Sequence, residues 1–139
     1  MGTISFNNHN IKFNLREKLY LKTFLSRVFA EEGVPFKSVS YIFCSDEFLL
    51  KLNSEYLIHD TYTDIITFTL SNTPLDIVSE IYISIDRVRE NSEKLKVPFE
   101  NELARVMIHG ILHLCGYKDK TKDQKSIMRG KEDHYLSLM

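Results

Sequence analysis

Hydrophobic and polar positions alternate with two periods along this chain, and each period predicts one kind of element. Alternating runs rich in β-branched and aromatic residues predict strands at residues 3–6, 38–43, 64–70 and 80–85. Apolar residues three and four positions apart predict helices that begin near residues 14, 45, 86, 98 and 121. Strands come early and helices late, which predicts an α+β domain with a small, mostly four-stranded mixed sheet packed against about five helices.

Short polar motifs predict where the helices begin. Segments 14–17 and 121–124 have the spacing of a capping box, in which two side chains satisfy the first amide groups of a helix. Asp86 is the expected N-cap of a helix that runs to about residue 96. With these starts, the apolar periodicity turns Leu19 and Ile127 toward the core.

The residues that can bind a metal ion lie in one run, His109-Gly-Ile-Leu-His113-Leu-Cys-Gly116-Tyr-Lys-Asp119. Residues four apart on a helix are neighbours on one face, so His109 and His113 can share one ion. Gly116 is placed to adopt the left-handed conformation that ends a helix, which lets the chain turn back and bring Asp119 to the ion. The run therefore predicts a metal site at a helix C-terminus.

Three protein ligands leave one position of a tetrahedral ion open, which is typical of a catalytic site, and water bound there is a nucleophile near neutral pH. In the zinc-peptidase motif His-Glu-x-x-His a glutamate is the general base, but Gly110 occupies that position here. Glu102, two helical turns before His109, is expected to be a partner of a ligand or a solvated residue. A metal hydroxide without a protein base suits hydrolysis of a phosphodiester better than of a peptide.

The segment from Arg105 to Tyr117 resembles the signature His-Gly-x-Leu-His-Leu-x-Gly-Tyr-Asp-His of the YbeY family, bacterial metal-dependent endoribonucleases that mature ribosomal RNA and act in ribosome quality control. Segments 52–56 and 63–68 resemble the family's Leu-Asn-x-x-Tyr-Arg and Thr-Asp-Val-Leu-Ser-Phe motifs. The resemblance implies the same fold over residues 40–135. It also implies hydrolysis of single-stranded ribosomal RNA during maturation of the small ribosomal subunit, with one divalent ion, zinc being the first expectation.

Two positions depart from the family pattern. Asp119 stands where the third histidine is expected, and Leu57 stands where an arginine follows the tyrosine. A carboxylate ligand lowers the net charge of the site, which weakens the Lewis acidity of the ion and shifts the metal preference toward manganese or iron. Leu57 lacks the guanidinium that suits phosphate. Both departures favour the alternative function, a non-catalytic ribosome assembly factor with a structural metal.

The set of two histidines and one carboxylate is also the facial triad of non-haem iron oxygenases. Such an enzyme needs a pocket for an organic co-substrate, and the sequence gives no sign of one. An oxygenase is therefore a weaker alternative than either ribosomal function.

Composition fits one small globular domain spanning residues 1–139, because 43% of the residues are hydrophobic and only three are proline. Cys44 and Cys115 are too few for a disulfide framework, and Cys115 is expected in the core, pointing to the side of the helix opposite His113. No run has the length of a membrane span and the N-terminus does not resemble a signal peptide, so we expect a cytoplasmic protein with no membrane partner.

The net charge of −1 does not indicate a nucleic-acid-binding protein, and DNA is not an expected partner. Residues 118–131 are nevertheless locally basic. Lys118, Lys120 and Lys122 lie next to Asp119 in the sequence, so they are candidates for binding the phosphates of a single RNA strand, with a solvated helix face as the alternative. His59 is a further candidate RNA contact by its place in the family pattern.

The remaining polar candidates are assigned structural or solvated roles. Thr63 and Asp64 are expected to brace the loop beside them. Arg87 and Arg89 are expected on a solvated face, with a place in the RNA groove as the alternative.

Overall fold

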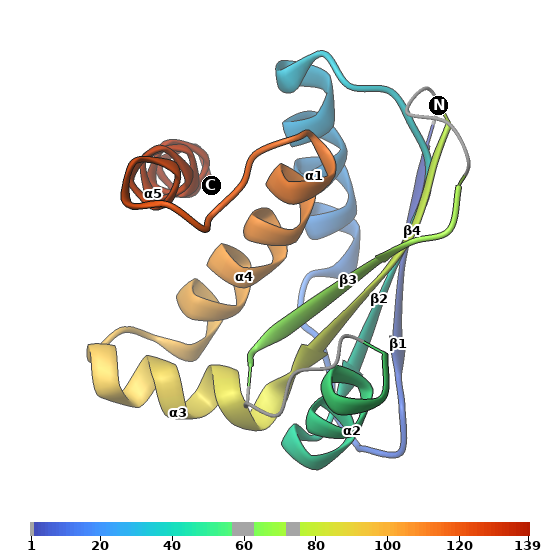
Figure 1. Cartoon of the computed structure of the whole chain (residues 1–139), viewed down its shortest axis with the longest axis vertical. Helices are drawn as coiled ribbons and strands as arrows, with labels where there is room; N and C mark the ends of the chain where they lie inside the picture. The colour runs from blue at the N-terminus through green and yellow to red at the C-terminus, as the bar shows by residue number, and fades with distance from the viewer. Residues whose placement is uncertain (1, 57–62, 72–75) are drawn as a thin grey trace.

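The computed structural model describes residues 2–56, 63–71 and 76–139 (Figure 1). In chain order the elements are β1 (Thr3–Asn8), α1 (Lys18–Glu32), β2 (Phe36–Cys44), α2 (Asp46–Tyr56), β3 (Ile65–Thr69), β4 (Ile77–Ser84), α3 (Ile85–Leu95), α4 (Phe99–Leu114) and α5 (Lys122–Ser137). This order confirms the predicted α+β class. No helix in the described ranges is long and apolar enough to cross a membrane.

The sheet is mixed and has the strand order β1-β2-β4-β3. β1 pairs parallel with β2, and β2 pairs parallel with β4. β3 pairs antiparallel with β4. The two central strands, β2 and β4, therefore provide the apolar surface on which the helices pack.

The two faces of the sheet are covered by different helices, because successive side chains of a strand point to opposite faces. On one face Ile81 and Ile83 of β4 pack with apolar residues of α1 and α4 in the main core. On the other face Tyr82 packs with a smaller cluster that includes Leu49 of α2 and Ile66 of β3. Figure 1 shows α4 between the sheet and α5, so α4 is covered on both sides.

At Gly110 the helix α4 packs closely on the sheet. A carbon added to it would lie 3.0 Å from side-chain carbons of both Ile65 and Ile81. Any side chain at this position, including the glutamate of the peptidase motif, would press on these two isoleucine side chains, which would have to shift. The glycine is thus explained by packing.

Two predicted helix starts are wrong. Segment 14–17 forms no capping box, because α1 begins only at Lys18 and Glu17 before it has a left-handed backbone and no capping hydrogen bond from its side chain. The N-cap of α3 is Ser84 rather than Asp86, since the Ser84 hydroxyl accepts a hydrogen bond from the Arg87 amide. The capping box at 121–124 is confirmed.

Two residues predicted to face the core are exposed. Leu19 on α1 is 79% exposed, because the helix begins later than predicted. Ile127 on α5 is 56% exposed. The buried face of α1 instead carries apolar residues with helical spacing, namely Leu21, Phe24, Leu25, Val28 and Phe29.

Replacing Gly110 with alanine should destabilise the fold. Overpacking costs about 1–3 kcal/mol, which exceeds the roughly 1 kcal/mol that alanine gains over glycine in a helix. Gly130→Ala on α5 is the matched control, because nothing lies within 4 Å of the added carbon, and it should stabilise the protein by about 0.5–1 kcal/mol. Urea unfolding measures both changes. Equal stability of the two variants would contradict the close packing of α4 on the sheet.

Candidate metal centre

The structure brings together the three side chains that the sequence predicted as ligands. The Nε2 atoms of His109 and His113 lie 2.9 Å apart. Asp119 Oδ2 lies 3.2 Å from His109 Nε2 and 3.3 Å from His113 Nε2. Two ligand atoms that share a tetrahedral zinc ion lie about 3.3 Å apart. The group can therefore hold one metal ion.

The end of α4 determines this arrangement. His109 and His113 occupy its last two turns, and Cys115 is its C-cap. Gly116 follows with a φ of 104°, and its amide donates to the His113 carbonyl, as expected for a chain that leaves a helix through a left-handed residue. This turn directs the chain back past the histidines, which places Asp119 opposite them. Cys115 packs against the core, as predicted.

Each imidazole is oriented by an acceptor at its other nitrogen. His109 Nδ1 lies 2.6 Å from Glu132 Oε2, and His113 Nδ1 lies 3.0 Å from the Tyr117 carbonyl oxygen. A carbonyl oxygen or a carboxylate can only accept, so each Nδ1 carries the donated proton. The Nε2 lone pairs of the neutral rings are then free to bind a metal ion.

Glu132 was not identified from the sequence, although it contacts a predicted ligand. It is buried on α5, and its Oε1 accepts a hydrogen bond of 2.9 Å from Arg105 Nη1. Burial raises the pKa of Glu132, but the hydrogen bonds from His109 and Arg105 outweigh that effect and lower it. Glu132 is therefore an anion that holds His109 in place.

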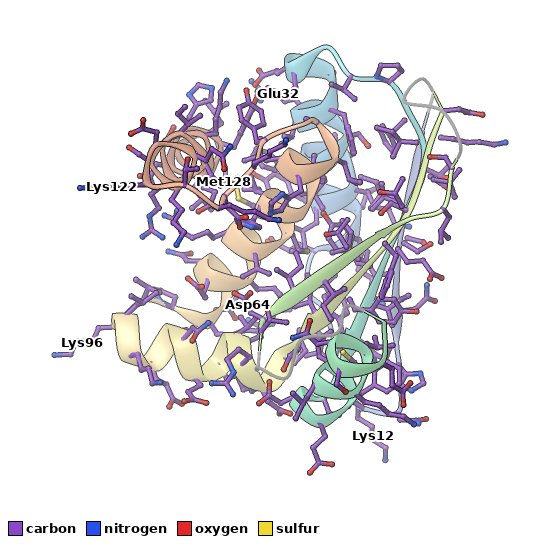
Figure 2. The ribbon with its side chains drawn as sticks, in the orientation of Figure 1. Lys12, Glu32, Asp64, Lys96, Lys122 and Met128 are labelled. Carbon is purple, nitrogen blue, oxygen red and sulfur yellow. The ribbon has the colours of Figure 1, made fainter. Side chains whose placement is uncertain are left out.

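A sequence signal for Glu132 existed. Met128, Glu132 and Tyr135 have the spacing of one helical face, and all three are buried. Figure 2 shows Met128 on the side of α5 that faces α4, and Lys122 pointing outward. A carboxylate between two buried apolar positions indicates a buried cationic partner or hydrogen-bond donor.

Glu32 of α1 stabilises the second imidazole indirectly. Its carboxylate accepts hydrogen bonds from the hydroxyls of Tyr117 and Tyr135, and from Lys131 Nζ at 3.3 Å. Burial raises the pKa of Glu32, yet these hydrogen bonds lower it overall. The contact fixes Tyr117, whose carbonyl oxygen orients His113.

Negative charge surrounds the candidate ligands. Burial lowers the pKa of His109, but the hydrogen bond to Glu132 and the charges of Glu132, Asp119 and Asp64 outweigh burial and raise it. A raised histidine pKa means that the surroundings favour positive charge. The same field favours a divalent cation, for which protons compete at low pH.

Two further carboxyl groups lie beside the site. The Asp64 backbone carbonyl accepts from the Ser84 amide, which fits the bracing role predicted for it, while burial raises the pKa of its carboxyl group. Burial also raises the pKa of Glu102, which is buried and not solvated. Asp64 lines both cavities at the site and its carboxyl group has a raised pKa, which makes it a candidate general base that the sequence pattern does not indicate.

Two cavities flank the site. One, of about 1160 Å³, is lined by β3 residues, both histidines, Asp119 and Lys120. The other, of about 310 Å³, contains Asp64, Lys125 and Glu132, and shares His109 and Asp119 with the first. An extended ligand could therefore pass directly over the candidate ligands.

The predicted RNA contacts are only partly placed near the site. Lys120 lines the larger of these cavities, while Lys118 and Lys122 are exposed. His59 and Leu57 lie outside the described residues. Arg87, expected on a solvated face, is instead half-buried and forms an ion pair of 2.7 Å with Asp46.

Comparisons with known proteins identify relatives over almost the whole chain. The family model described as Endoribonuclease YbeY matches residues 3–139. A curated protein named Endoribonuclease YbeY from Flavobacterium psychrophilum is 50% identical over 135 residues, covering 97% of this chain and 95% of the relative. Its counterpart from Cytophaga hutchinsonii is 46% identical over 136 residues, covering 98% and 95%. The solution structure of a Thermotoga maritima protein is similar with a TM-score of 0.64 and 29% identity, covering 96% of this chain and 87% of that one.

Glu132→Gln should weaken zinc binding by about 10–100-fold, because the neutral amide no longer offers two anionic oxygens to His109 and Arg105. Asp133→Asn is the matched control. Asp133 accepts a hydrogen bond of 2.6 Å from the same Arg105 but is exposed, whereas the carboxylate that contacts the His109 ring is that of Glu132. Competition with a chromophoric chelator measures both affinities. A loss of the same size in both variants would show that Glu132 acts only through Arg105.

Proposed function

The chain belongs to the YbeY family of endoribonucleases, and on that premise we propose that it is a metal-dependent endoribonuclease that hydrolyses single-stranded RNA. The observation that carries the proposal is the convergence of His109 Nε2, His113 Nε2 and Asp119 Oδ2 on one point. Such a donor set with an open position is typical of catalytic rather than structural metal sites.

His109, His113 and Asp119 would hold one divalent ion, with zinc as the first choice. A bound ion supplies Lewis acidity and lowers the pKa of water. The surrounding residues prepare the site for it: Glu132 orients the His109 ring and the Tyr117 carbonyl orients His113. The anionic ligand Asp119 reduces the charge of the site, which extends the range of acceptable ions toward manganese and iron.

The charges around the site support a polyanionic substrate. Lys120 lies in the cavity that contains the ligands, and Lys125 and Arg129 lie in the adjoining one. These cations can bind phosphates on either side of the bond to be cleaved. Asp64 lines both cavities, so we propose its carboxylate as the group that accepts a proton from water.

The biological substrate follows from the family resemblance. Ribosomal RNA, cleaved during maturation and quality control of the small subunit, is the substrate that we propose, and the cytoplasm is the corresponding location. The names of the relatives, Endoribonuclease YbeY, support the reaction class. Nothing in these comparisons favours an iron oxygenase.

Asp119 favours one alternative, a ribosome assembly factor without nuclease activity. A carboxylate in place of the family's third histidine gives a less electrophilic ion, which a structural role tolerates better than a catalytic one. Such a protein would bind the metal ion and the RNA but would leave the RNA intact.

His113→Ala should reduce cleavage of a single-stranded RNA by more than about 100-fold, because the loss of a metal ligand costs at least as much as the loss of a residue that orients one. His134→Ala, an exposed histidine on the same protein, is the control and should cleave normally. Gel analysis of a labelled RNA, with circular dichroism to verify folding, measures the effect.

The outcomes separate the two functions. Equal cleavage by wild type and His113→Ala would assign the activity to a contaminant. Intact RNA with metal-loaded wild type would instead favour the assembly factor.

A further inference from the structure

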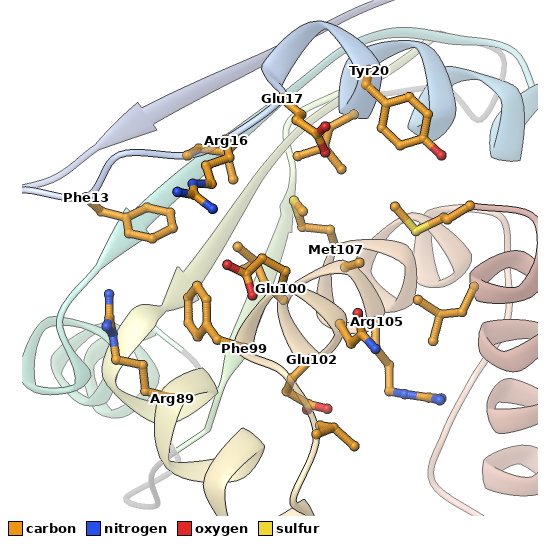
Figure 3. A pocket seen from close by; sticks show the side chains of 18 of the residues that line it. Phe13, Arg16, Glu17, Tyr20, Arg89, Phe99, Glu100, Glu102, Arg105 and Met107 are labelled. Atoms are coloured by element: carbon orange, nitrogen blue, oxygen red, sulfur yellow. The ribbon is translucent and has the colours of Figure 1, made fainter.

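A cavity of about 1380 Å³ shares Arg105 with the small cavity beside the candidate metal centre. It is formed by the segment that leads into α1, the junction of α3 and α4, and the end of α5. We call it the α1–α4 cavity, and the residues that matter most here are Phe13, Arg16, Tyr20, Arg89, Phe99 and Arg105. Figure 3 shows Arg16 and Arg89 around the rings of Phe13 and Phe99 at one end, with Arg105 at the other.

The α1–α4 cavity adjoins the candidate metal centre. Glu102, Arg105 and Arg129 line it, and the same three residues line the small cavity that also contains His109 and Asp119. The α1–α4 cavity is therefore a neighbouring site for a strand that extends from the metal centre past Arg105.

Aromatic rings and guanidinium groups stand together at the far end of this cavity. The rings of Phe13 and Phe99 meet edge to face with centroids 5.9 Å apart, and the Arg89 guanidinium lies 4.8 Å from the centroid of the Phe99 ring. Tyr20, which is 46% exposed, lines another part of the cavity, where its ring stacks on Phe24 (Figure 3). Arg16 and Arg89 are exposed and form no ion pair with any residue that the structure describes. Aromatic rings beside guanidinium groups are typical of sites that bind single-stranded nucleic acids, because bases stack on the rings and arginines bind the phosphates.

From this arrangement we propose that the α1–α4 cavity binds the RNA strand on one side of the cleaved bond, with a base at the Phe13 and Phe99 end and backbone phosphates on Arg16 and Arg89. The inference rests on the proposed ribonuclease function and adds a binding subsite to it. The larger cavity beside Lys120 would then hold the strand on the other side of the bond.

The carboxylates in the cavity limit where phosphates can lie. Glu17 and Glu100 also line the cavity and would repel a phosphate placed against them. They can instead accept hydrogen bonds from the amino groups of bases, as carboxylates do from cytosine. Phosphates are therefore directed to the arginines and base edges to the glutamates, an arrangement that a strand of alternating phosphates and bases can meet.

The test compares two double variants that each remove two positive charges. Arg16→Ala/Arg89→Ala removes the arginines of the cavity. Arg27→Ala/Lys94→Ala removes two exposed cations of α1 and α3 that do not line it. Fluorescence anisotropy of the metal-loaded, full-length protein with a labelled single-stranded RNA, read while a gel shows the RNA intact, gives the affinity at several salt concentrations. Circular dichroism verifies folding.

The cavity variant should bind the RNA roughly tenfold more weakly, and the slope of log affinity against log salt should fall by about 0.7 for each lost phosphate contact. In cleavage assays its KM should rise while kcat stays within about twofold, because the arginines bind substrate away from the reacting bond. The control variant should match wild type in all three quantities.

Unchanged affinity in the cavity variant would overturn the inference and leave the cavity to a protein partner or to none. An equal loss in both variants would also overturn it, since net charge alone would explain the effect. Failure of the ribonuclease function would be visible separately, because wild type would then bind the RNA without cleaving it.

Discussion

The packing of α4 between the sheet and α5 is the constraint on which the candidate metal centre depends. Gly110 lets the helix approach Ile65 and Ile81, and this fixes the direction in which the histidines of its last two turns point. On the opposite side, the hydrogen bond of 2.6 Å between His109 and Glu132 joins α4 to α5. The site is therefore held by tertiary packing as well as by its own short sequence run, and loss of either contact would misplace a ligand.

The distribution of charge explains how a protein with a net charge of −1 can act on RNA. The acidic residues near the site, such as Glu102 and Glu132, are buried, where they favour a cation. The basic residues, such as Lys125 and Arg129, lie on the exposed rim of the same cavity. In the proposed function the buried carboxylates would favour the metal ion and the exposed cations would bind the RNA, and the net charge of the chain reflects neither group.

Short sequence patterns predicted those features that depend only on neighbouring residues of the chain. The three candidate ligands could be predicted because a helical spacing and one glycine turn place them together. The helical spacing of Glu132 indicates that it is buried with a partner, but not that the partner is His109, because that contact depends on how α5 packs on α4. Asp64 reaches the site only through the packing of a distant element. The N-cap of α3 was also mispredicted. Ser84 is the last residue of β4, and the strand passes into the helix without a loop, so the helix begins before Asp86, the acidic residue that the sequence suggested as its cap. Leu19 was misassigned because α1 begins later than its polar motif suggested.

The most direct test of this account is the position of a metal ion in crystals of the protein, located by anomalous scattering at the absorption edge of zinc. The account predicts one strong peak about 2.0–2.2 Å from His109 Nε2, His113 Nε2 and an Asp119 carboxylate oxygen, with a fourth position facing the cavities. A peak at any other residues, or none at this group while the protein retains stoichiometric zinc, would contradict it.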